Sequence, residues 1–457
     1  MRDAIHDYLI TAGDQIRWNR ARPALLAELE DHLRSEEEAC RAAGLSKDEA
    51  QAEAVRQMGD PVIIGQELDR VHRPKPQWGL LGLTLLVSLA VTVLRVELTK
   101  DWWVQDGIFW GNNSGHCYLA LFLGTALLLA GYFLDYTFLA KWGNSLFPLG
   151  LLFGFLFLPY WFMHVDPYHT ESLCYYAAHV FLLAMPLCYG GWLYAQRKRT
   201  WKGFLLSTLP LPLIPAIAYS AHYSFTLGVG SILILSAACL LLLAVLTWAD
   251  WFGLGKRLSR WLAIGLVVMY SMVFLYFVSL LSPAHSLSAA FHPELYYDTY
   301  GQTAMTVRHV LEGAQWFGPS EWMGQYYYWE SLSSARDSFF LTTVLQRLGW
   351  GPYLLLTGGF VIIALWLLVK GLRQRSILGR IVSLSVALPF LLQTIFGVMT
   401  SLGFIWFAVP FPLVGGNCIL SVQMALIGLV LSVFRQESLP TAEVKIKPLF
   451  FFLPEVR

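Results

Sequence analysis

The chain has 457 residues, of which 56% are hydrophobic and only 14% are charged. Soluble proteins carry about 25% charged residues, so this deficit and the repeated long apolar runs argue against a soluble globular enzyme. They indicate instead an all-α protein that crosses a membrane many times. The net charge of +1 gives no reason to expect a nucleic-acid partner, and the six cysteines lack the spacing of a zinc site.

Residues 1–75 are rich in charge, and their pattern predicts a small cytoplasmic bundle of helices. Ser46 and Glu49 have the spacing of a capping box, which starts a helix, and Gly59 is expected to end that helix. The Asp-Pro pair directly after Gly59 suits the start of the next helix. Two roles remain open for this domain: a purely structural bundle, or a docking site for a cytoplasmic partner.

Ten apolar segments follow within residues 76–435, and each is long enough to cross a hydrocarbon core about 30 Å thick as a helix. The segment over 203–219 contains three prolines, so we expect it to be kinked or broken. Residues 436–457 then form a cytoplasmic tail. The ten segments lie near residues 78–96, 116–134, 145–163, 174–195, 203–219, 228–248, 261–282, 352–370, 381–401 and 416–434.

Lysine and arginine gather in alternate short loops between these segments, and the loops between them are nearly free of basic residues. Because cytoplasmic loops carry the excess of basic residues, this pattern places both termini of the multi-pass protein in the cytoplasm. The basic residues are Arg197, Lys198, Arg199 and Lys202 in one loop, Lys256, Arg257 and Arg260 in the next, and Lys370, Arg373, Arg375 and Arg380 in a third.

One long outer loop, residues 283–338, joins two of the membrane segments. Long structured loops of membrane proteins are commonly functional. This loop is rich in acidic and aromatic side chains. The aromatic side chains suit either the interfacial aromatic belt or a platform for a sugar or a lipid headgroup.

Asp337 lies at the end of this loop and is followed by an apolar stretch over 338–345 that is too short to span the membrane. We expect that stretch to form a re-entrant or interfacial helix that runs into the next membrane segment. A carboxylate beside it would be partly desolvated, which suits it to proton transfer. A solvated loop charge is the alternative interpretation of Asp337.

Five landmarks in the last third of the chain occur in the order typical of one family. They are Phe291-His292-Pro293 with Tyr300-Gly301-Gln302, then Gly313–Gly318, Ser333–Trp350, Gln393–Gly403 and Pro410–Cys418. The last of these fits, without a gap, the motif Pro-Phe-x-Ser-Tyr-Gly-Gly-Ser-Ser. On these landmarks, residues 286–435 resemble the C-terminal half of the SEDS family, the FtsW/RodA/SpoVE-like proteins that polymerise peptidoglycan.

The N-terminal region carries a second resemblance. The matching residues are Glu28-Leu29-x-x-His32, Ala43-Gly44-Leu45-Ser46, Glu49-Ala50 and Gly59-Asp60-Pro61. In these positions residues 1–75 resemble the HAAS domain, a short cytoplasmic prefix of bacterial permease-like proteins. That resemblance implies a regulatory role and a cytoplasmic partner whose identity is unknown.

The SEDS resemblance implies a protein of the bacterial cytoplasmic membrane that carries out glycosyl transfer on lipid II, an undecaprenyl-pyrophosphate-linked substrate, at the outer face of that membrane. It assigns Asp337 as the general base and implies work beside a class B penicillin-binding protein in division, elongation or sporulation. The leaving pyrophosphate needs cations, for which Arg308 and Arg336 are candidates, or a divalent ion such as Mg or Mn. Three further candidates for substrate binding are Gly415, Gly416 and Asn417, of which the glycines also suit close helix approach or a turn.

The chain departs from the family pattern at several positions, and two of these departures affect the proposed site residues. Counted back from Gly349, the family's aspartate falls on Ser338, so Asp337 stands one residue early. The Ser-Ser pair of the glycine motif is replaced by Asn417-Cys418. These departures keep a second function open: a catalytically inactive SEDS-like scaffold or sensor, or a lipid-carrier flippase, in envelope assembly.

Overall fold

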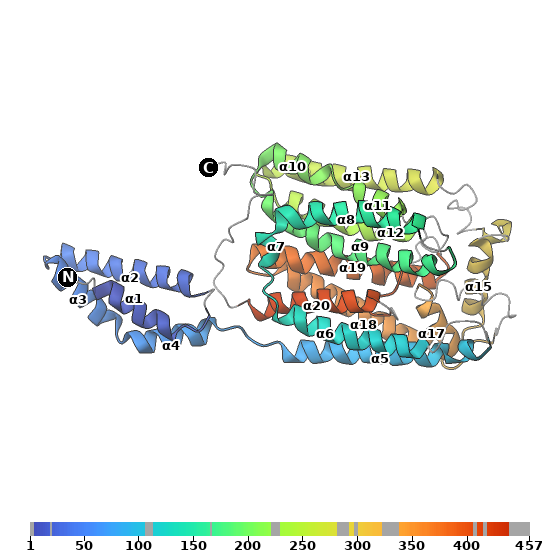
Figure 1. Cartoon of the computed structure of the whole chain (residues 1–457), viewed down its shortest axis with the longest axis horizontal. Helices are drawn as coiled ribbons and strands as arrows, with labels where there is room; N and C mark the ends of the chain where they lie inside the picture. The colour runs from blue at the N-terminus through green and yellow to red at the C-terminus, as the bar shows by residue number, and fades with distance from the viewer. Residues whose placement is uncertain are drawn as a thin grey trace. The chain divides into compact units, whose positions relative to one another are not determined.

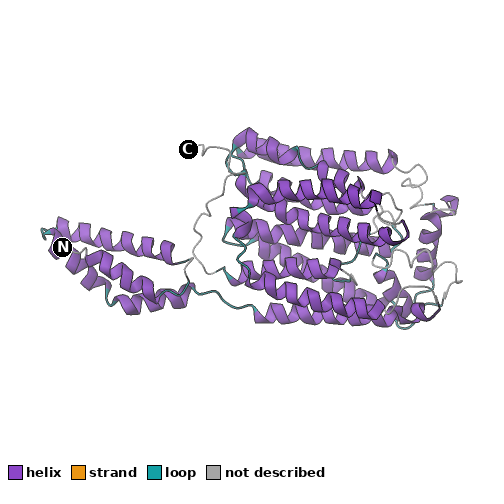
Figure 2. Cartoon of the chain, in the orientation of Figure 1, coloured by secondary structure: helices purple, strands orange, loops and turns teal. Residues whose placement is uncertain are grey.

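The computed structural model describes residues 4–18, 21–105, 113–164, 167–220, 229–280, 292–296, 300–321, 338–404, 409–414 and 418–437. Every regular element in these ranges is a helix (Figure 2). The all-α membrane fold predicted from the sequence is therefore confirmed. The chain divides into two compact units, Met1–Trp78 with Val433–Val444, and Gly79–Ser432 with Lys445–Arg457.

The first unit contains four helices whose apolar sides enclose a small core. The core residues are Ile5, Tyr8, Ala12, Leu29 and Leu33, with a second cluster of Ile16, Ala21 and Leu25. Their spacing of three or four residues puts them on one side of each helix. The helices are α1 (Ala4–Gln15), α2 (Arg22–Ala42), α3 (Lys47–Met58) and α4 (Pro61–His72).

The boundaries of α3 and α4 are set by the local signals that the sequence contains. Ser46 Oγ accepts a hydrogen bond from the Glu49 N–H, and Glu49 Oε2 accepts one from the Ser46 N–H at 3.1 Å, so the capping box is confirmed. Gly59 ends α3 at a φ of 91°, a conformation that favours glycine. Asp60 then caps α4 by accepting a hydrogen bond from the Val62 N–H at 2.8 Å.

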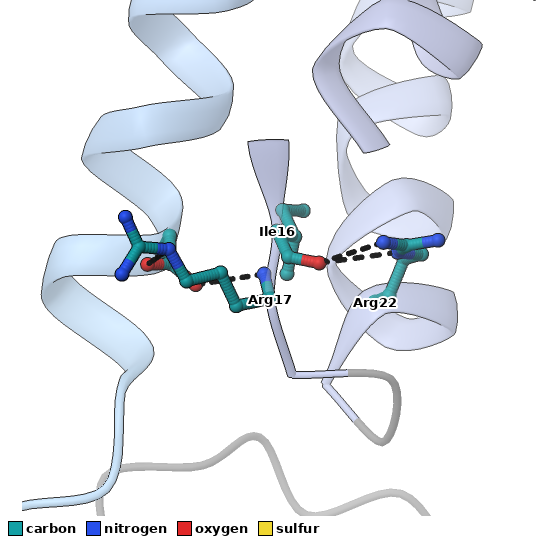
Figure 3. Close-up of polar contacts among 4 residues, drawn as sticks. Ile16, Arg17 and Arg22 are labelled. Carbon is teal, nitrogen blue, oxygen red and sulfur yellow. Dashed lines mark hydrogen bonds and ion pairs between the residues drawn. The ribbon is translucent and has the colours of Figure 1, made fainter. Parts of the chain in front are cut away.

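Polar contacts fix the end of α1 to both of its neighbours (Figure 3). The Arg22 guanidinium at the start of α2 donates two hydrogen bonds to the Ile16 carbonyl, at 2.8 and 3.3 Å. On the other side, the Arg17 N–H donates to Asp69 of α4 at 2.9 Å. Both groups are backbone atoms just past the end of α1, where a helix leaves its last carbonyls without partners, and the Ile16 carbonyl finds its partner in Arg22.

The second unit is a layered set of roughly parallel and antiparallel long helices (Figure 1). A helix lies at each of the ten predicted segments, and the segment over 203–219 is broken into two helices by turns at residues 209–212. The helices are α5 (Trp78–Gln105), α6 (Asn113–Phe133), α7 (Phe138–Lys141), α8 (Gly143–His164), α9 (Pro167–Ala195), α10 (Thr200–Thr208), α11 (Leu213–Ser220), α12 (Val229–Trp248), α13 (Lys256–Leu280), η2 (Pro293–Tyr296), α15 (Tyr300–Glu312), α17 (Phe340–Leu348), α18 (Trp350–Leu372), α19 (Ile377–Ser401) and α20 (Cys418–Arg435).

Several of these helices are long and apolar enough to cross a membrane. Within the described residues, five stretches meet both criteria: Trp78–Leu98, Gly115–Phe133, Thr200–Ala218, Trp350–Leu372 and Ile377–Ser401. Shorter apolar stretches are Gly143–Leu156, His179–Ala195, Ile234–Trp248 and Ile419–Arg435. The protein is therefore a multi-pass membrane protein.

Small residues allow α6 and α20 to pack backbone against backbone. A Cβ added to Gly428 would collide with the Leu128 carbonyl, and one added to Gly131 would lie 2.7 Å from the Ala425 carbonyl oxygen. Ser421 Oγ also donates across this interface, at 3.0 Å from a backbone carbonyl of α6. Helices inside a membrane usually associate by close approach at glycine and serine, because burial of apolar surface gives little driving force for association there.

Candidate functional site

The predicted outer loop is described in part, as η2, as α15 with the turn that follows it to residue 321, and as Ser338, which lies two residues before α17. Figure 1 shows α15 and α17 at one end of the membrane unit, away from α7 and α10. Of the residues that the sequence proposes for the site, Arg308 is described. The other five lie outside the described residues: Asp337, Arg336, Gly415, Gly416 and Asn417.

The predicted short helix after Asp337 is present as α17. It begins after Ser338 and Phe339, which are themselves buried, and all of its residues from Phe340 to Gln346 are buried. It packs against α15, α18 and α19. A helix of nine residues rises only about 13.5 Å, so α17 enters the protein without crossing a membrane.

Gly349 forms the hinge between α17 and α18. Its φ of 89° favours glycine, and a Cβ at this position would lie 2.5 Å from the Gln315 carbonyl oxygen. That close approach exists because the turn after α15 binds the hinge. The Trp350 N–H donates to the Gln315 carbonyl and the Gly351 N–H donates to the Trp316 carbonyl, both at 2.9 Å. Two landmarks of the sequence, Gly313–Gly318 and Ser333–Trp350, therefore meet at this point.

A buried pair of glutamines fixes the segment Pro410–Val414. Gln393 of α19 donates to the Pro410 carbonyl at 3.1 Å, and its Oε1 accepts from Gln423 of α20 at 3.1 Å. Gln423 Oε1 accepts in turn from the Leu413 N–H at 2.7 Å. Leu413 has a φ of 61°, which is unusual for leucine, and this bond holds it there. Buried polar networks of this kind are stable only when their members are paired.

Arg95 is a site residue that the sequence analysis did not single out. It lies on α5 and its guanidinium donates to the Val414 carbonyl at 2.8 Å, one residue before the Gly415–Asn417 stretch. The signal was present in the sequence, because Arg95 is the one charged residue within segment 78–96. Ionisable residues inside membrane segments are costly and commonly mark functional sites.

Arg308 lies on α15, outside the membrane segments, and its side chain is 37% exposed. Its Nη1 is 4.0 Å from Oε2 of Glu294, whose Oε1 is 3.2 Å from Nδ1 of His292. A hydrogen bond from its own backbone N–H, followed by the contacts with His292 and Arg308, lowers the pKa of Glu294 below its ordinary value. Arg308 thus belongs to an exposed cluster of alternating charge, and the role in pyrophosphate binding stays a prediction.

In the part of the chain that the structure describes, no group of three His, Cys, Asp or Glu side chains is arranged to hold a metal ion. The Mg or Mn ion allowed by the sequence also stays a prediction, and the chemistry below is assigned to protein groups alone.

The fold, with α15 and α17 at one end of the membrane unit, defines a class of protein. It is an all-α, multi-pass membrane protein in which a short buried helix, α17, leads into a spanning helix, α18. No protein-family model matches the chain, and no curated protein sequence matches it either. Among the solved structures, a chain described under "Structural coordination of polymerization and crosslinking by a peptidoglycan synthase complex" is similar to this protein over most of its length. The similarity has a TM-score of 0.55 at 18% sequence identity, and it covers 79% of this chain and 98% of the other.

Proposed function

We propose that this protein polymerises lipid II as a SEDS-like peptidoglycan glycosyltransferase at the outer face of the cytoplasmic membrane. The fold shared with a chain from a peptidoglycan synthase complex supports this proposal. The observation that carries it is the meeting of the family landmarks at one end of the unit. There the turn Gly313–Gly318 binds the hinge of α17 and α18, and Gln393 and Gln423 bind the segment Pro410–Val414.

In the proposed reaction, Asp337 takes the proton from the acceptor sugar hydroxyl as that oxygen attacks the anomeric carbon of the donor. The bond from that carbon to undecaprenyl pyrophosphate breaks, and the linkage inverts. A base that begins the segment entering the protein suits this chemistry, because the lipid tail stays in the bilayer while the sugars react at its surface. Asp337 directly precedes Ser338, which is buried at 6% exposure.

Asp337 stands one residue before the position of the family's aspartate, which is Ser338 in this chain, and the start of α17 determines whether both positions lie within a helix. A helix turns about 100° per residue, so an offset inside a helix would redirect the carboxylate. The helix begins at Phe340, and both position 337 and position 338 precede it. Position 337 lies outside the described residues, so activity assays of Asp337 variants decide between a catalytic and an inactive protein.

Positive charge is needed for the departing pyrophosphate. Arg336 and Arg308 are the candidates from the outer loop, and Arg95 adds a third whose guanidinium binds the backbone beside Gly415. A class B penicillin-binding protein is the proposed partner. The N-terminal unit is proposed as a cytoplasmic regulatory domain that binds a further, unidentified partner.

The test is polymerisation of purified lipid II by the full chain with a class B penicillin-binding protein, read as glycan chains on a gel. We expect Asp337→Ala to abolish polymer and the double variant D337S/S338D, which moves the acid to the family position, to retain it. Glu312→Ala, an exposed acid on α15, is the matched control and should behave as the wild type. Equal activity of wild type and Asp337→Ala would remove Asp337 from the mechanism.

The replacement of the family's Ser-Ser by Asn417-Cys418 favours the second candidate function, an inactive scaffold, a sensor or a lipid-carrier flippase. If the wild type and D337S/S338D both fail to make polymer under conditions in which a SEDS polymerase succeeds, this second function replaces the first.

A further inference from the structure

Two loops at the end of the membrane unit opposite to α15 are joined to each other by backbone hydrogen bonds. They are residues 196–200, from the end of α9 to the first residue of α10, and residues 249–255, between α12 and α13; we call them the paired loops. The Lys198 N–H donates to the Trp251 carbonyl at 3.2 Å, and the Thr200 N–H donates to the Phe252 carbonyl at 3.0 Å. These bonds fix Lys198 at a φ of 59° and Thr200 at 51°, in a region that residues other than glycine rarely adopt.

The paired loops and the first turns of α10 and α13 carry a concentrated positive charge. The exposed cations are Lys198, Arg199, Lys202, Lys256, Arg257 and Arg260. The acid among them, Asp250, is engaged in holding its own loop: its Oδ1 accepts from the Gly255 N–H at 3.0 Å and from Ser259 Oγ at 2.7 Å. The surface therefore presents far more positive than negative charge to an approaching ligand.

Exposed aromatic rings suit this surface to the level of lipid headgroups. Trp201, Trp248 and Trp261 are 47%, 51% and 65% exposed, and tryptophan gathers at the interface between membrane and water. The guanidinium of Arg260 lies 5.7 Å above the Trp248 ring. A cation held over an interfacial ring lies at the depth where lipid phosphates lie.

An exposed apolar surface continues directly from the cations. The helix break between α10 and α11 leaves leucines facing outward, and Leu209 at the break is 70% exposed. The other exposed leucines of these two helices are Leu205, Leu206 and Leu213. A nucleic acid or an acidic peptide would meet only the cations. A phospholipid would use both parts of the surface, its phosphate on the cations and its acyl chain on the leucines.

We propose that the paired loops, with the exposed leucines of α10 and α11, bind the headgroup and upper acyl chain of an anionic phospholipid. Each basic residue near a membrane surface adds to the affinity for anionic lipid, and the effect falls off within a Debye length. The site is independent of the proposed glycosyltransferase activity, because it lies at the other end of the unit from α15 and α17 (Figure 1).

The experiment titrates the full chain, purified in a neutral detergent, with dioleoylphosphatidylglycerol and counts bound lipid by native mass spectrometry. We expect saturable binding that is weaker by roughly 30-fold in K202Q/R257Q, which removes one charge beside each of the paired loops. The matched control is R373Q/R375Q, which removes two charges from the loop between α18 and α19 and should bind as the wild type does. K198Q/K256Q is a second test pair with the same expectation, should the first fail to fold.

Parallel titrations with dioleoylphosphatidylcholine and with inorganic phosphate distinguish the sources of the ligand chemistry. Weak binding of both supports the proposal. Equal losses in the test and control variants, or no loss in either, would show that the paired loops are not the site. Inorganic phosphate that displaces the anionic lipid at a similar concentration would show that the leucines contribute nothing, and would overturn the assignment to a lipid.

Discussion

Gln423 of α20 donates a hydrogen bond to Oε1 of Gln393 of α19 at 3.1 Å, and both side chains are buried. The remaining polar groups of this pair bind the backbone at Pro410 and Leu413, so two side chains fix the path of the chain between two membrane helices. The segment that they fix leads directly into Gly415, a candidate substrate-binding residue.

The glutamine pair predicts a specific loss of stability. Gln423→Leu leaves the Leu413 N–H and Gln393 Oε1 buried without partners, and we expect it to destabilise the protein by about 1–3 kcal/mol. The control is Thr394→Val in α19, because the Thr394 hydroxyl binds only a carbonyl of its own helix, that of Phe390. Unfolding of both variants in detergent micelles measures the difference. Similar midpoints for the two variants would mean that the pair does not hold the segment.

The hinge at Gly349 gives a second prediction. Gly349→Ala introduces a Cβ 2.5 Å from the Gln315 carbonyl oxygen at a φ of 89°, so we expect a lower unfolding temperature and weaker lipid II polymerisation. Gly358→Ala in α18 is the matched control, because a Cβ there meets no atom within 4 Å. That variant should be as stable as the wild type or slightly more so. A Gly349→Ala protein with wild-type stability would show that the hinge tolerates the side chain.

The sequence predicted the parts of the structure that depend on local signals. The capping box of Ser46 and Glu49 and the helix end at Gly59 involve residues within a few positions of one another, and both are confirmed. The spanning helices follow from the length of apolar segments, a property that a single sequence displays directly. The break in segment 203–219 was expected from its prolines, and turns lie at residues 209–212.

The contacts of the candidate site could not be predicted in the same way, because they join residues far apart in the chain. Arg95 and Val414 are 319 positions apart, and Gln393 and Gln423 are 30 positions apart. Only the packing of the helices brings these side chains to their partners. The resemblance identified Gln393–Gly403 and Pro410–Cys418 as landmarks, but it did not reveal that a glutamine of one binds the backbone of the other.

The capping box predicts a pH dependence in the N-terminal unit. Hydrogen bonds from the Ser46 hydroxyl and backbone lower the pKa of Glu49 below its ordinary value of 4.5. A carboxylate with a lowered pKa stabilises the fold above that ordinary value and loses the effect as the pH falls through the lowered one. The protection of α3 amides against hydrogen exchange in the full chain, taken relative to the intrinsic exchange rate at each pH, should therefore fall in acid.

Ser46→Ala tests that dependence. We expect exchange in α3 to be roughly fivefold faster near neutral pH, with a weaker further change in acid, because the cap is already lost. Ser35→Ala is the control, since Ser35 is exposed within α2 and caps no helix. If the two variants exchange alike, or if Ser46→Ala keeps the full acid response, Glu49 owes its stabilising effect to something other than Ser46.

Arg95 gives the prediction that bears most directly on the proposed chemistry. If its charge helps the pyrophosphate to leave, Arg95→Gln should slow lipid II polymerisation at least tenfold, whereas Arg95→Lys, which keeps the charge but loses the planar fork, should retain part of the rate. If Arg95 serves only to hold the Val414 carbonyl, both variants should instead lower the unfolding temperature together. Polymerisation rates and unfolding temperatures measured on the same preparations separate the two roles. If Arg95→Gln has the wild-type rate and the wild-type unfolding temperature, Arg95 has neither role.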